Sequence, residues 1–255
     1  MIKFIASDLD GTILLNGAQA VDKSLIDVIE KLLDKGVLFA PASGRQIVSL
    51  KRLFQPISDR LVYISENGAL IEYQGKVIGK TAIDRDLAME ILEDVYSMPN
   101  CELLISGQDT AYIKPKTKEY YHRMTEVVNY DTTLIDNFND IKEDIIKIAV
   151  CDLSGICNSR EHFFEKWKDK ASVAVSGELY LDFTEKSVTK GKGIKQIQEY
   201  FGLSVHECMA FGDNFNDITM LDNVAESYVM ENACDEVKKH GKYITDRVEN
   251  ILRRL

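Results

Sequence analysis

Two aspartates directly follow an apolar stretch near the start of the sequence. The segment FIASDLDGT, residues 4–12, places Asp8 and Asp10 two residues apart, just before a glycine and a threonine. Aspartate is a poor strand former, and two carboxylates this close together repel each other. Phosphoryl transfer uses such a pair, because it needs an anionic nucleophile, a second acid that moves a proton and a cation that neutralises phosphate oxygens. A helix N-cap is the alternative, but the Asp-x-Asp-Gly-Thr pattern directly after an apolar strand favours the chemical role.

A second pair of acids occurs far along the chain, in the segment GDNFND, residues 212–217. Asp213 and Asp217 lie four residues apart across a predicted strand-to-helix turn, and their oxygens suit a hard cation such as Mg²⁺. An Asx-type helix cap is one alternative. A calcium-binding loop is a poorer one, because the EF-hand pattern and its terminal glutamate are missing.

Two further segments could bind phosphate. Ser43-Gly44-Arg45 follows a predicted strand, where a small hydroxyl residue and a glycine expose backbone N–H groups. Taken alone, such a Ser-Gly is more often a structural turn. The segment TKGKG, residues 189–193, places Lys190 beside glycines at a predicted helix start, where it could hold a phosphate oxygen. The segment lacks the P-loop spacing, and a solvated helix start is an equal alternative.

An alternation of strands and helices must position these four segments. In the first part of the chain, strands are predicted at 2–7, 37–43 and 61–65, and helices at 24–35 and 46–54. The alternation resumes near residue 188, with strands at 208–213 and 227–230 and helices at 191–201, from 216, at 234–239 and at the end of the sequence. This pattern predicts a parallel sheet with right-handed crossovers. Ligands bind beyond the carboxyl ends of such strands, so we expect the segments to meet at one edge.

The middle of the sequence breaks this alternation. Residues 69–80 are predicted to form a hairpin that turns near Gln74-Gly75, and from about residue 83 helices mix with short strands on short links. We therefore expect a discontinuous α/β core, residues 1–82 and 184–255, with an α+β domain inserted at 83–183. Within that insert, the tyrosine-rich segment 119–130 is predicted to be a half-buried helix, with contact to a ligand as the alternative.

The order and position of the motifs resemble those of the haloacid dehalogenase (HAD) superfamily. Asp8-Leu9-Asp10-Gly11-Thr12 and Gly212-Asp213-x-x-Asn216-Asp217 carry the resemblance, which covers essentially the whole chain. The inserted domain and the segment ISENGALIEYQGKVI, residues 64–78, resemble the Cof-type phosphatases of subclass IIB. The resemblance implies an α/β fold with a Rossmann-like parallel-sheet core and an inserted α+β cap that sets substrate specificity.

The resemblance also implies catalytic roles. Asp8 would be the nucleophile that forms an aspartyl-phosphate, and Asp10 would be the general acid and base. Mg²⁺ would be held by the Asp8 carboxylate, the backbone carbonyl of Asp10 and the Asp213 side chain. Thr12 and Asp217 would have supporting roles, Asp217 by orienting the lysine of the site.

The same resemblance implies a phosphate-binding set. Lys190 would neutralise phosphate charge; Lys192 is a rival, but the small pair Val188-Thr189 directly before Lys190 favours Lys190. Arg45 would face the phosphate or the cap. The family often has threonine at the position of Ser43, and the hydroxyl is kept here. The remaining expected phosphate contacts are the backbone N–H groups of Leu9 and Gly44 and the side chains of Ser43 and Asn216.

Composition narrows the possible partners and surroundings. The 255-residue chain has a formal net charge of −10 and no basic run, which argues against nucleic-acid binding. No stretch approaches the roughly 20 consecutive apolar residues of a membrane span, and an acid at position 8 leaves no signal-peptide core. The five cysteines are scattered, so neither a disulfide framework nor a zinc site is expected. We expect a cytoplasmic protein that is a monomer or a weak homodimer.

These observations lead to one expected function and two alternatives. The expectation is a Mg²⁺-dependent phosphatase that hydrolyses a small phosphorylated metabolite, with a sugar phosphate as the first choice, through an aspartyl-phosphate. A phosphomutase on the same core would return the phosphate to the sugar. A non-catalytic sensor of phosphorylated metabolites is the alternative from another class, and the presence of Asp8, Asp10, Lys190 and Asp213 together argues against it.

Overall fold

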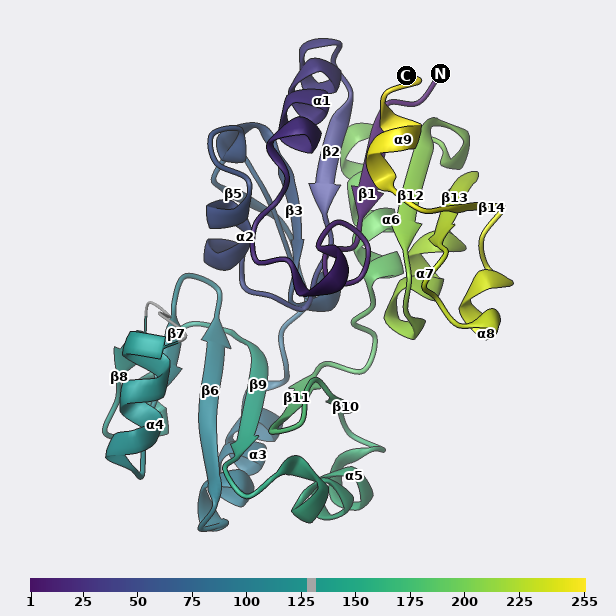
Figure 1. Ribbon diagram of the computed structural model, residues 1–255. Helices are drawn as coiled ribbons and strands as arrows, with labels where there is room; N and C mark the ends of the chain where they lie inside the picture. Colours follow the sequence, from purple (N-terminus) through teal and green to yellow (C-terminus); the bar gives the residue numbers. More distant parts are fainter. Residues whose placement is uncertain (128–131) are drawn as a thin grey trace. The chain divides into compact units, whose positions relative to one another are not determined.

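The computed structural model describes residues 1–127 and 132–255 and divides the chain into two compact units (Figure 1). Unit 1 consists of Met1–Lys80 and Thr189–Leu255, and unit 2 consists of Thr81–Val188. Unit 1 is therefore built from two separate parts of the chain, and unit 2 is a continuous insert between them. Unit 1 is an α/β unit with a parallel sheet, whereas unit 2 is an α+β unit with a mainly antiparallel sheet.

Unit 1 is built on a five-stranded parallel sheet with the order β14-β13-β12-β1-β2. Its strands are β1 (Phe4–Ser7), β2 (Leu38–Pro41), β12 (Cys208–Gly212), β13 (Glu226–Met230) and β14 (Tyr243–Thr245). Ser7 at the end of β1 is level with Pro41 of β2 and Phe211 of β12. The residues that follow these three strands therefore emerge together at one edge of the sheet.

Helices cover both faces of this sheet. On one face, a shared apolar cluster is formed with α1 (Lys23–Asp34), α2 (Ile47–Leu53) and α9 (Val248–Leu252). On the other face, a second cluster is formed with α6 (Lys190–Phe201), α7 (Ile218–Leu221) and α8 (Asp235–Lys238). Side chains alternate along β1, so Ile5 packs into the first cluster and Phe4 and Ala6 pack into the second. Burial on both faces explains why this strand has a continuous apolar sequence.

The strand predicted at 61–65 does not join the parallel sheet as a full strand, which corrects the sequence expectation. It forms β3 (Val62–Ser65), which has a single parallel bridge, between Ile64 and Ala42, the residue directly after β2. Its main partner is the antiparallel strand β4 (Leu70–Tyr73). The chain reverses directly after β3 in the 3-10 turn Glu66–Gly68, so β3 pairs with the next segment along the chain instead of leading into a crossover.

The hairpin predicted at 69–80 is confirmed. β4 pairs with the antiparallel strand β5 (Lys76–Lys80), and the two residues between them, Gln74 and Gly75, have φ angles of 49° and 74°. Positive φ at both positions is the conformation that a two-residue type I′ turn requires.

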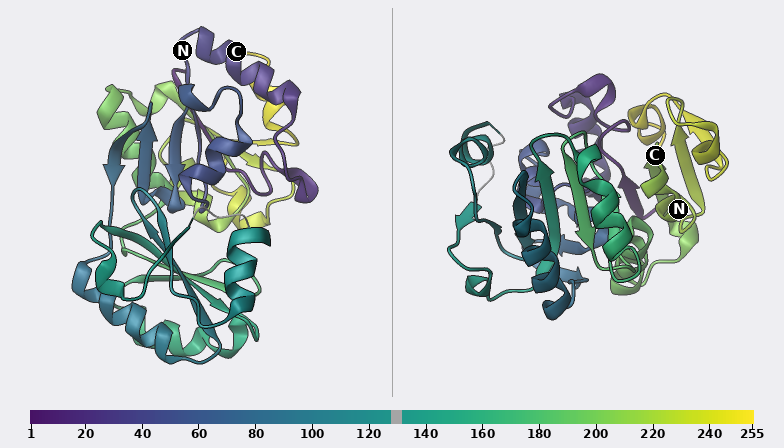
Figure 2. Two further views of the ribbon diagram at one scale, coloured as in Figure 1. Left: turned by 90° about the vertical axis from the view of Figure 1, so that its left-hand side faces the viewer. Right: turned by 90° about the horizontal axis from the view of Figure 1, so that it is seen from below.

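Unit 2 has a six-stranded sheet with the order β10-β11-β9-β6-β7-β8, in which only β7 and β8 are parallel. The helices α3 (Arg85–Ser97) and α5 (Arg160–Trp167) pack on one face in a single apolar cluster, and α4 (Lys118–His122) covers part of the other (Figure 2). The strands are β6 (Cys101–Gly107), β7 (Ala111–Ile113), β8 (Thr132–Leu134), β9 (Ile145–Asp152), β10 (Ser172–Val175) and β11 (Tyr180–Thr184).

Two short edge strands, β8 and β14, are not predicted from the sequence pattern. Each has three residues at a sheet edge and offers too few positions for a period to be read. In the segment 119–130, α4 is followed by a π-helical turn at Arg123–Val127, and residues 128–130 lie outside the described residues. No helix in the described part of the chain is long and apolar enough to cross a membrane.

Gly68 brings the reversal after β3 against the segment that precedes α6. Its φ is +99°, and a Cβ added at this position would lie 2.3 Å from the backbone oxygen of Thr189. Only glycine permits this approach, because any side chain would meet the backbone there. The residue that follows Thr189 is Lys190, so this contact helps to fix where α6 begins.

The approach at Gly68 leads to a test of the fold. Gly36→Ala, just after α1, also places alanine at a positive φ of 82°, but no heavy atom lies within 4 Å of the added Cβ. We expect Gly36→Ala to lower the free energy of unfolding by about 1 kcal/mol. Gly68→Ala should lower it by roughly 2–4 kcal/mol, because overpacking adds to the backbone strain. Urea unfolding followed by far-UV circular dichroism measures both variants, and equal losses would contradict a structural role for the contact with Thr189.

Candidate active site

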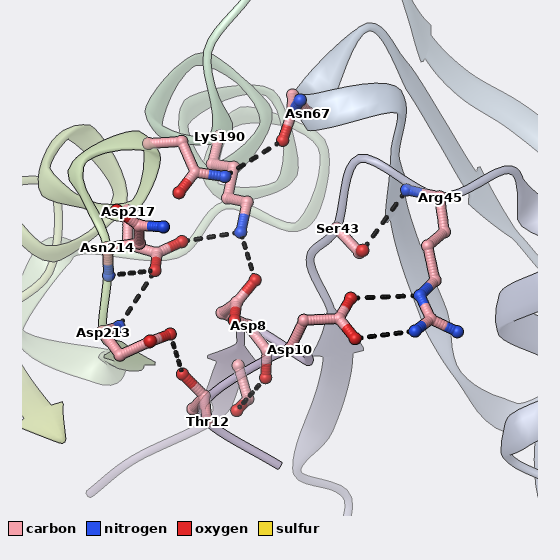
Figure 3. A network of polar contacts seen from close by, with 12 residues as sticks. Asp8, Asp10, Thr12, Ser43, Arg45, Asn67, Lys190, Asp213, Asn214 and Asp217 are labelled. Carbon is pink, nitrogen blue, oxygen red and sulfur yellow. Dashed lines mark hydrogen bonds and ion pairs between the residues drawn. The ribbon is translucent and has the colours of Figure 1, made fainter. Parts of the chain in front are cut away.

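Asp8 directly follows β1 and is almost completely buried, with 6% of its surface exposed. Its backbone N–H donates to the carbonyl of Phe211 in β12 at 2.9 Å, which extends the pairing of the two strands to this residue. Its carboxylate oxygen Oδ1 accepts a hydrogen bond from Lys190 Nζ at 2.5 Å (Figure 3). The apolar strand thus holds the backbone of Asp8 in place, and Lys190 stabilises its negative charge.

Lys190 is the first residue of α6, and its side chain is fully buried. Its ammonium group lies between two carboxylates and donates to Asp8 Oδ1 at 2.5 Å and to Asp217 Oδ1 at 2.6 Å. Lys192, the rival for this role, is only half-buried, and its backbone N–H donates to the capping side chain of Thr189. The structure therefore places Lys190, and not Lys192, among the acids.

Asp217, the second acid of the later pair, hydrogen-bonds to the backbone just after β12. Its Oδ2 accepts hydrogen bonds from the backbone N–H groups of Asp213 and Asn214, both at 3.0 Å. The bond from Asn214 is one half of a capping box at the 3-10 turn Phe215–Asp217, which leads into α7. The alternative interpretation of this segment as a helix cap therefore describes one of its two acids. Asp217 is fully buried, and both of its carboxylate oxygens already have hydrogen-bond donors.

Asp213 follows β12 and approaches the turn after β1. Its Oδ1 accepts a hydrogen bond from the hydroxyl of Thr12 at 2.9 Å. Gly11 makes this approach possible, since a Cβ added there would lie 2.2 Å from Asp213 Oδ2. The Gly-Thr pair after the first two aspartates therefore has a physical reason: the glycine leaves space for Asp213, and the threonine holds it.

The three buried or half-buried acids form a group that could hold a metal ion. One carboxylate oxygen each from Asp8, Asp213 and Asp217 lie within 4.8 Å of one another. Burial raises the pKa of the Asp8 carboxyl to about 7; Lys190 opposes this shift, whereas the charges of Asp217 and Asp213 add to it. Burial also raises the pKa of Asp213. One ammonium group thus leaves an excess of negative charge, and a divalent cation bound by carboxylate oxygens would offset it.

The hydrogen bonds suggest which acids would bind such a cation directly. Asp217 is occupied by Lys190 and by two backbone N–H groups, so we infer a supporting role for it. Asp8 accepts a hydrogen bond from Lys190 on one oxygen, and Asp213 accepts hydrogen bonds from the neutral side chains of Thr12 and Asn232, so these two are the better candidates for direct ligands. The donor set fits a hard cation such as Mg²⁺, because hard cations prefer oxygen ligands.

Asp10 points away from the three acids. Its side chain is 57% exposed and forms a bidentate ion pair with Arg45, from Nη2 to Oδ1 at 2.6 Å and from Nε to Oδ2 at 3.0 Å (Figure 3). Arg45, which the family resemblance predicts to face a phosphate or the cap, pairs with Asp10 in this structure, and its contact with a phosphate or the cap stays a prediction. The sequence contained both residues but no pattern that joins them.

The segment after β2 forms a second polar group at this edge of the sheet. Ser43 is buried, and its backbone N–H donates to the Ile64 carbonyl at 2.9 Å. Asn67 lies against Gly44, where an added Cβ would be 3.0 Å from its amide nitrogen, and it accepts a hydrogen bond from Asn216 Nδ2 at 3.3 Å (Figure 3). Asn67 is not among the residues predicted from the sequence; its positive φ of 58°, in the segment Ser65-Glu66-Asn67-Gly68, is a left-handed conformation in which asparagine is enriched.

Two further residues contribute to the turn after β1. Leu9 is fully buried between the aspartates, and its carbonyl accepts N–H groups from Thr12 at 3.2 Å and Leu14 at 2.7 Å, which closes the turn after β1. A second residue that was not predicted, Asn232, donates to the Gly11 carbonyl in that turn at 3.0 Å.

The structure gathers the other candidate residues in three groups. The first group holds Asp8, Thr12, Lys190, Asp213 and Asp217, the second Asp10 and Arg45, and the third Ser43, Gly44, Asn67 and Asn216.

Similar proteins cover almost the full length of the chain. The 5-amino-6-(5-phospho-D-ribitylamino)uracil phosphatase YbjI of Escherichia coli (strain K12) is 27% identical over 244 residues, which are 95% of this chain and 90% of that protein. A solved structure from Eubacterium rectale is 29% identical, with a TM-score of 0.87 over 99% of this chain and 98% of the other. The subclass IIB sugar phosphatase BT4131 shares the fold at 22% identity, with a TM-score of 0.78 over 99% of this chain and 98% of that one.

A family model provides the assignment. The model of the haloacid dehalogenase-like hydrolases matches residues 5–251, a range that contains both acid pairs, Ser43 and Lys190. The structural neighbours share the same fold over nearly the whole chain, including the inserted unit 2. The protein therefore belongs to the haloacid dehalogenase-like hydrolases and resembles the Cof-type members of subclass IIB.

Proposed function

We propose that this protein is a Mg²⁺-dependent phosphatase that hydrolyses phosphate monoesters of small metabolites through an aspartyl-phosphate on Asp8. The observation that carries the proposal is the position of Asp8, a buried carboxylate at the end of β1 that contacts Lys190 and lies among further acids. A site that only bound an anion would be weakened by three carboxylates, whereas a nucleophile with a metal ion requires them. The name of the relative YbjI supports hydrolysis over transfer to a second hydroxyl.

The proposed reaction has two displacements at phosphorus. In the first, an Asp8 carboxylate oxygen attacks phosphorus, the bond to the ester oxygen breaks, and the departing oxygen takes a proton from Asp10. In the second, water attacks the aspartyl-phosphate, Asp10 accepts a proton from this water, and the Asp8 carboxylate leaves phosphorus. The products are an alcohol and inorganic phosphate, and both aspartates return to their starting state.

Asp10 must leave Arg45 before it can serve as the acid. The ion pair engages both oxygens of the Asp10 carboxyl group and holds the side chain away from Asp8. Both side chains are partly exposed, and a pair of this kind contributes only about 0–1 kcal/mol. Opening the pair is therefore a small cost, and rotation of the Asp10 side chain would then aim it at the departing oxygen.

Charge neutralisation would come from the metal and from groups of unit 1. Asp8, Asp213 and the Asp10 carbonyl would hold Mg²⁺, which supplies positive charge beside the phosphate oxygens when bound. Lys190 already contacts Asp8, so its ammonium group would lie beside the transferred phosphoryl group. The other proposed phosphate contacts are the N–H groups of Leu9 and Gly44 and the side chains of Ser43 and Asn216.

We propose that unit 2 is the cap that sets substrate specificity, since every residue placed in the proposed chemistry belongs to unit 1. We also propose a phosphorylated sugar or sugar alcohol as the substrate class. The name of YbjI supports this choice, because it describes a phosphate on a ribityl chain.

The nucleophile can be tested with Asp8→Asn. An amide is a poor nucleophile, so we expect the phosphate released from sugar phosphates to fall roughly 10⁴-fold or more. Asp27→Asn, an exposed position on α1, is the matched control and should leave the rate unchanged. A rate for Asp8→Asn within tenfold of the native rate would contradict the aspartyl-phosphate mechanism.

The metal requirement can be tested by chelation. EDTA should abolish phosphate release, and added Mg²⁺ should restore it. Asp213→Asn removes a proposed direct ligand, so the Mg²⁺ concentration for half-maximal activity should rise at least about 100-fold. Full activity after exhaustive chelation, or an unchanged Mg²⁺ requirement in Asp213→Asn, would exclude the metal centre proposed for this site.

A further inference from the structure

Asn232 reaches the candidate site from a strand that carries none of the predicted site residues. It lies two residues after β13, which is next to β12 on the side away from β1. Its Nδ2 donates to the Gly11 carbonyl at 3.0 Å and to Asp213 Oδ2 at 3.4 Å. An amide nitrogen carries two hydrogens, so one side chain can serve both acceptors. The Asn232 side chain therefore spans the ends of three neighbouring strands.

Both oxygens of Asp213 are held by neutral donors. Thr12 donates to Oδ1 at 2.9 Å, and Asn232 donates to Oδ2 at 3.4 Å. Neither donor cancels the negative charge of the carboxylate, so it remains available to a cation. The two donors fix the rotation of the Asp213 side chain. Thr12 lies in the turn after β1, and Asn232 lies in the turn after β13.

We propose that Asn232 is a positioning residue that sets Asp213 and the turn at Gly11 in the arrangement that binds the metal ion. The inference rests on the proposed function, because it assumes a metal at Asp8 and Asp213. The second hydrogen bond extends the role, since Gly11 directly follows Asp10, whose carbonyl is a proposed ligand. One amide thus ties the side-chain ligand after β12 to the backbone ligand after β1.

A matched pair of asparagines allows this role to be separated from a structural one. Asn250 is also exposed, and its Nδ2 donates to the aspartate carboxylate of Asp246 at 2.9 Å, outside the candidate site. Asn232→Ala and Asn250→Ala therefore each remove one amide donor from an aspartate of unit 1. Asn232→Leu keeps the approximate bulk of the side chain and removes its polar amide group.

The experiment is isothermal titration calorimetry of the whole protein with Mg²⁺ alone. Groups that orient metal ligands typically change metal affinity 10–100-fold. We expect the Mg²⁺ dissociation constant to rise about tenfold in both Asn232 variants, at the low end of that range because the bond to Asp213 is long and exposed. Asn250→Ala should bind as the native protein does, and thermal unfolding midpoints without metal should agree among all four proteins. At saturating Mg²⁺, the kcat of Asn232→Ala should return to within about twofold of the native value, because the bound metal then holds Asp213.

The possible failures are distinguishable. If the native protein binds Mg²⁺ and Asp213→Asn does not, but both Asn232 variants bind normally, the positioning role is wrong and the proposed function stands. A lowered unfolding midpoint without a change in Mg²⁺ affinity would assign Asn232 to the fold and also overturn the inference. If the native protein binds no Mg²⁺, or Asp213→Asn binds it equally well, the proposed metal centre fails and the inference fails with it.

Discussion

The ammonium group of Lys190, buried between Asp8 and Asp217, is the interaction on which the candidate site depends. Although burial alone would lower the pKa of Lys190, the charges of Asp8 and Asp217 raise it, so the amine stays charged. Removal of one partner from a buried ion pair is strongly destabilising, because the other charge is left uncompensated. Burial is the main cause of the raised pKa of Asp8, and the charges of Asp217 and Asp213 add to it, whereas the pKa of Lys190 is raised by the charges of Asp8 and Asp217. We infer that the single ammonium group does not balance these carboxylates and that a bound cation would offset the remaining negative charge.

The fold brings these charges together through strand register and close backbone contacts. Parallel strands that end at one level place residues 8, 43 and 213 at the same edge, although more than 200 residues separate the first from the last. Gly191 permits a close approach of α6 to α7, since a Cβ at Gly191 would lie 2.3 Å from the Thr219 carbonyl oxygen. The glycine beside Lys190 is thereby explained by helix packing, in addition to any role in phosphate binding.

The sequence could predict the parallel sheet, the hairpin and the meeting of Asp8 with the second acid pair, because each follows from a local pattern. Apolar runs that end in acids mark strand ends, and parallel strands share one edge. It could not predict the ion pair of Asp10 with Arg45 or the contacts of Asn67 and Asn232. These contacts join residues that lie far apart in the sequence, and no periodic pattern of residue types indicates them. The three-residue strand β14 was missed for a related reason, since its place is set by pairing with β13.

The central claim is that Asp8 and Asp213 share one Mg²⁺ while Asp8 accepts the phosphoryl group. The most direct measurement is a crystal structure of the protein grown with Mg²⁺ and beryllium fluoride, which mimics a phosphoryl group on a carboxylate. We expect beryllium bonded to an Asp8 oxygen, and Mg²⁺ roughly 2.0–2.1 Å from oxygens of both Asp8 and Asp213. Beryllium fluoride bonded to another residue, or a metal ion bound away from these two aspartates, would contradict it.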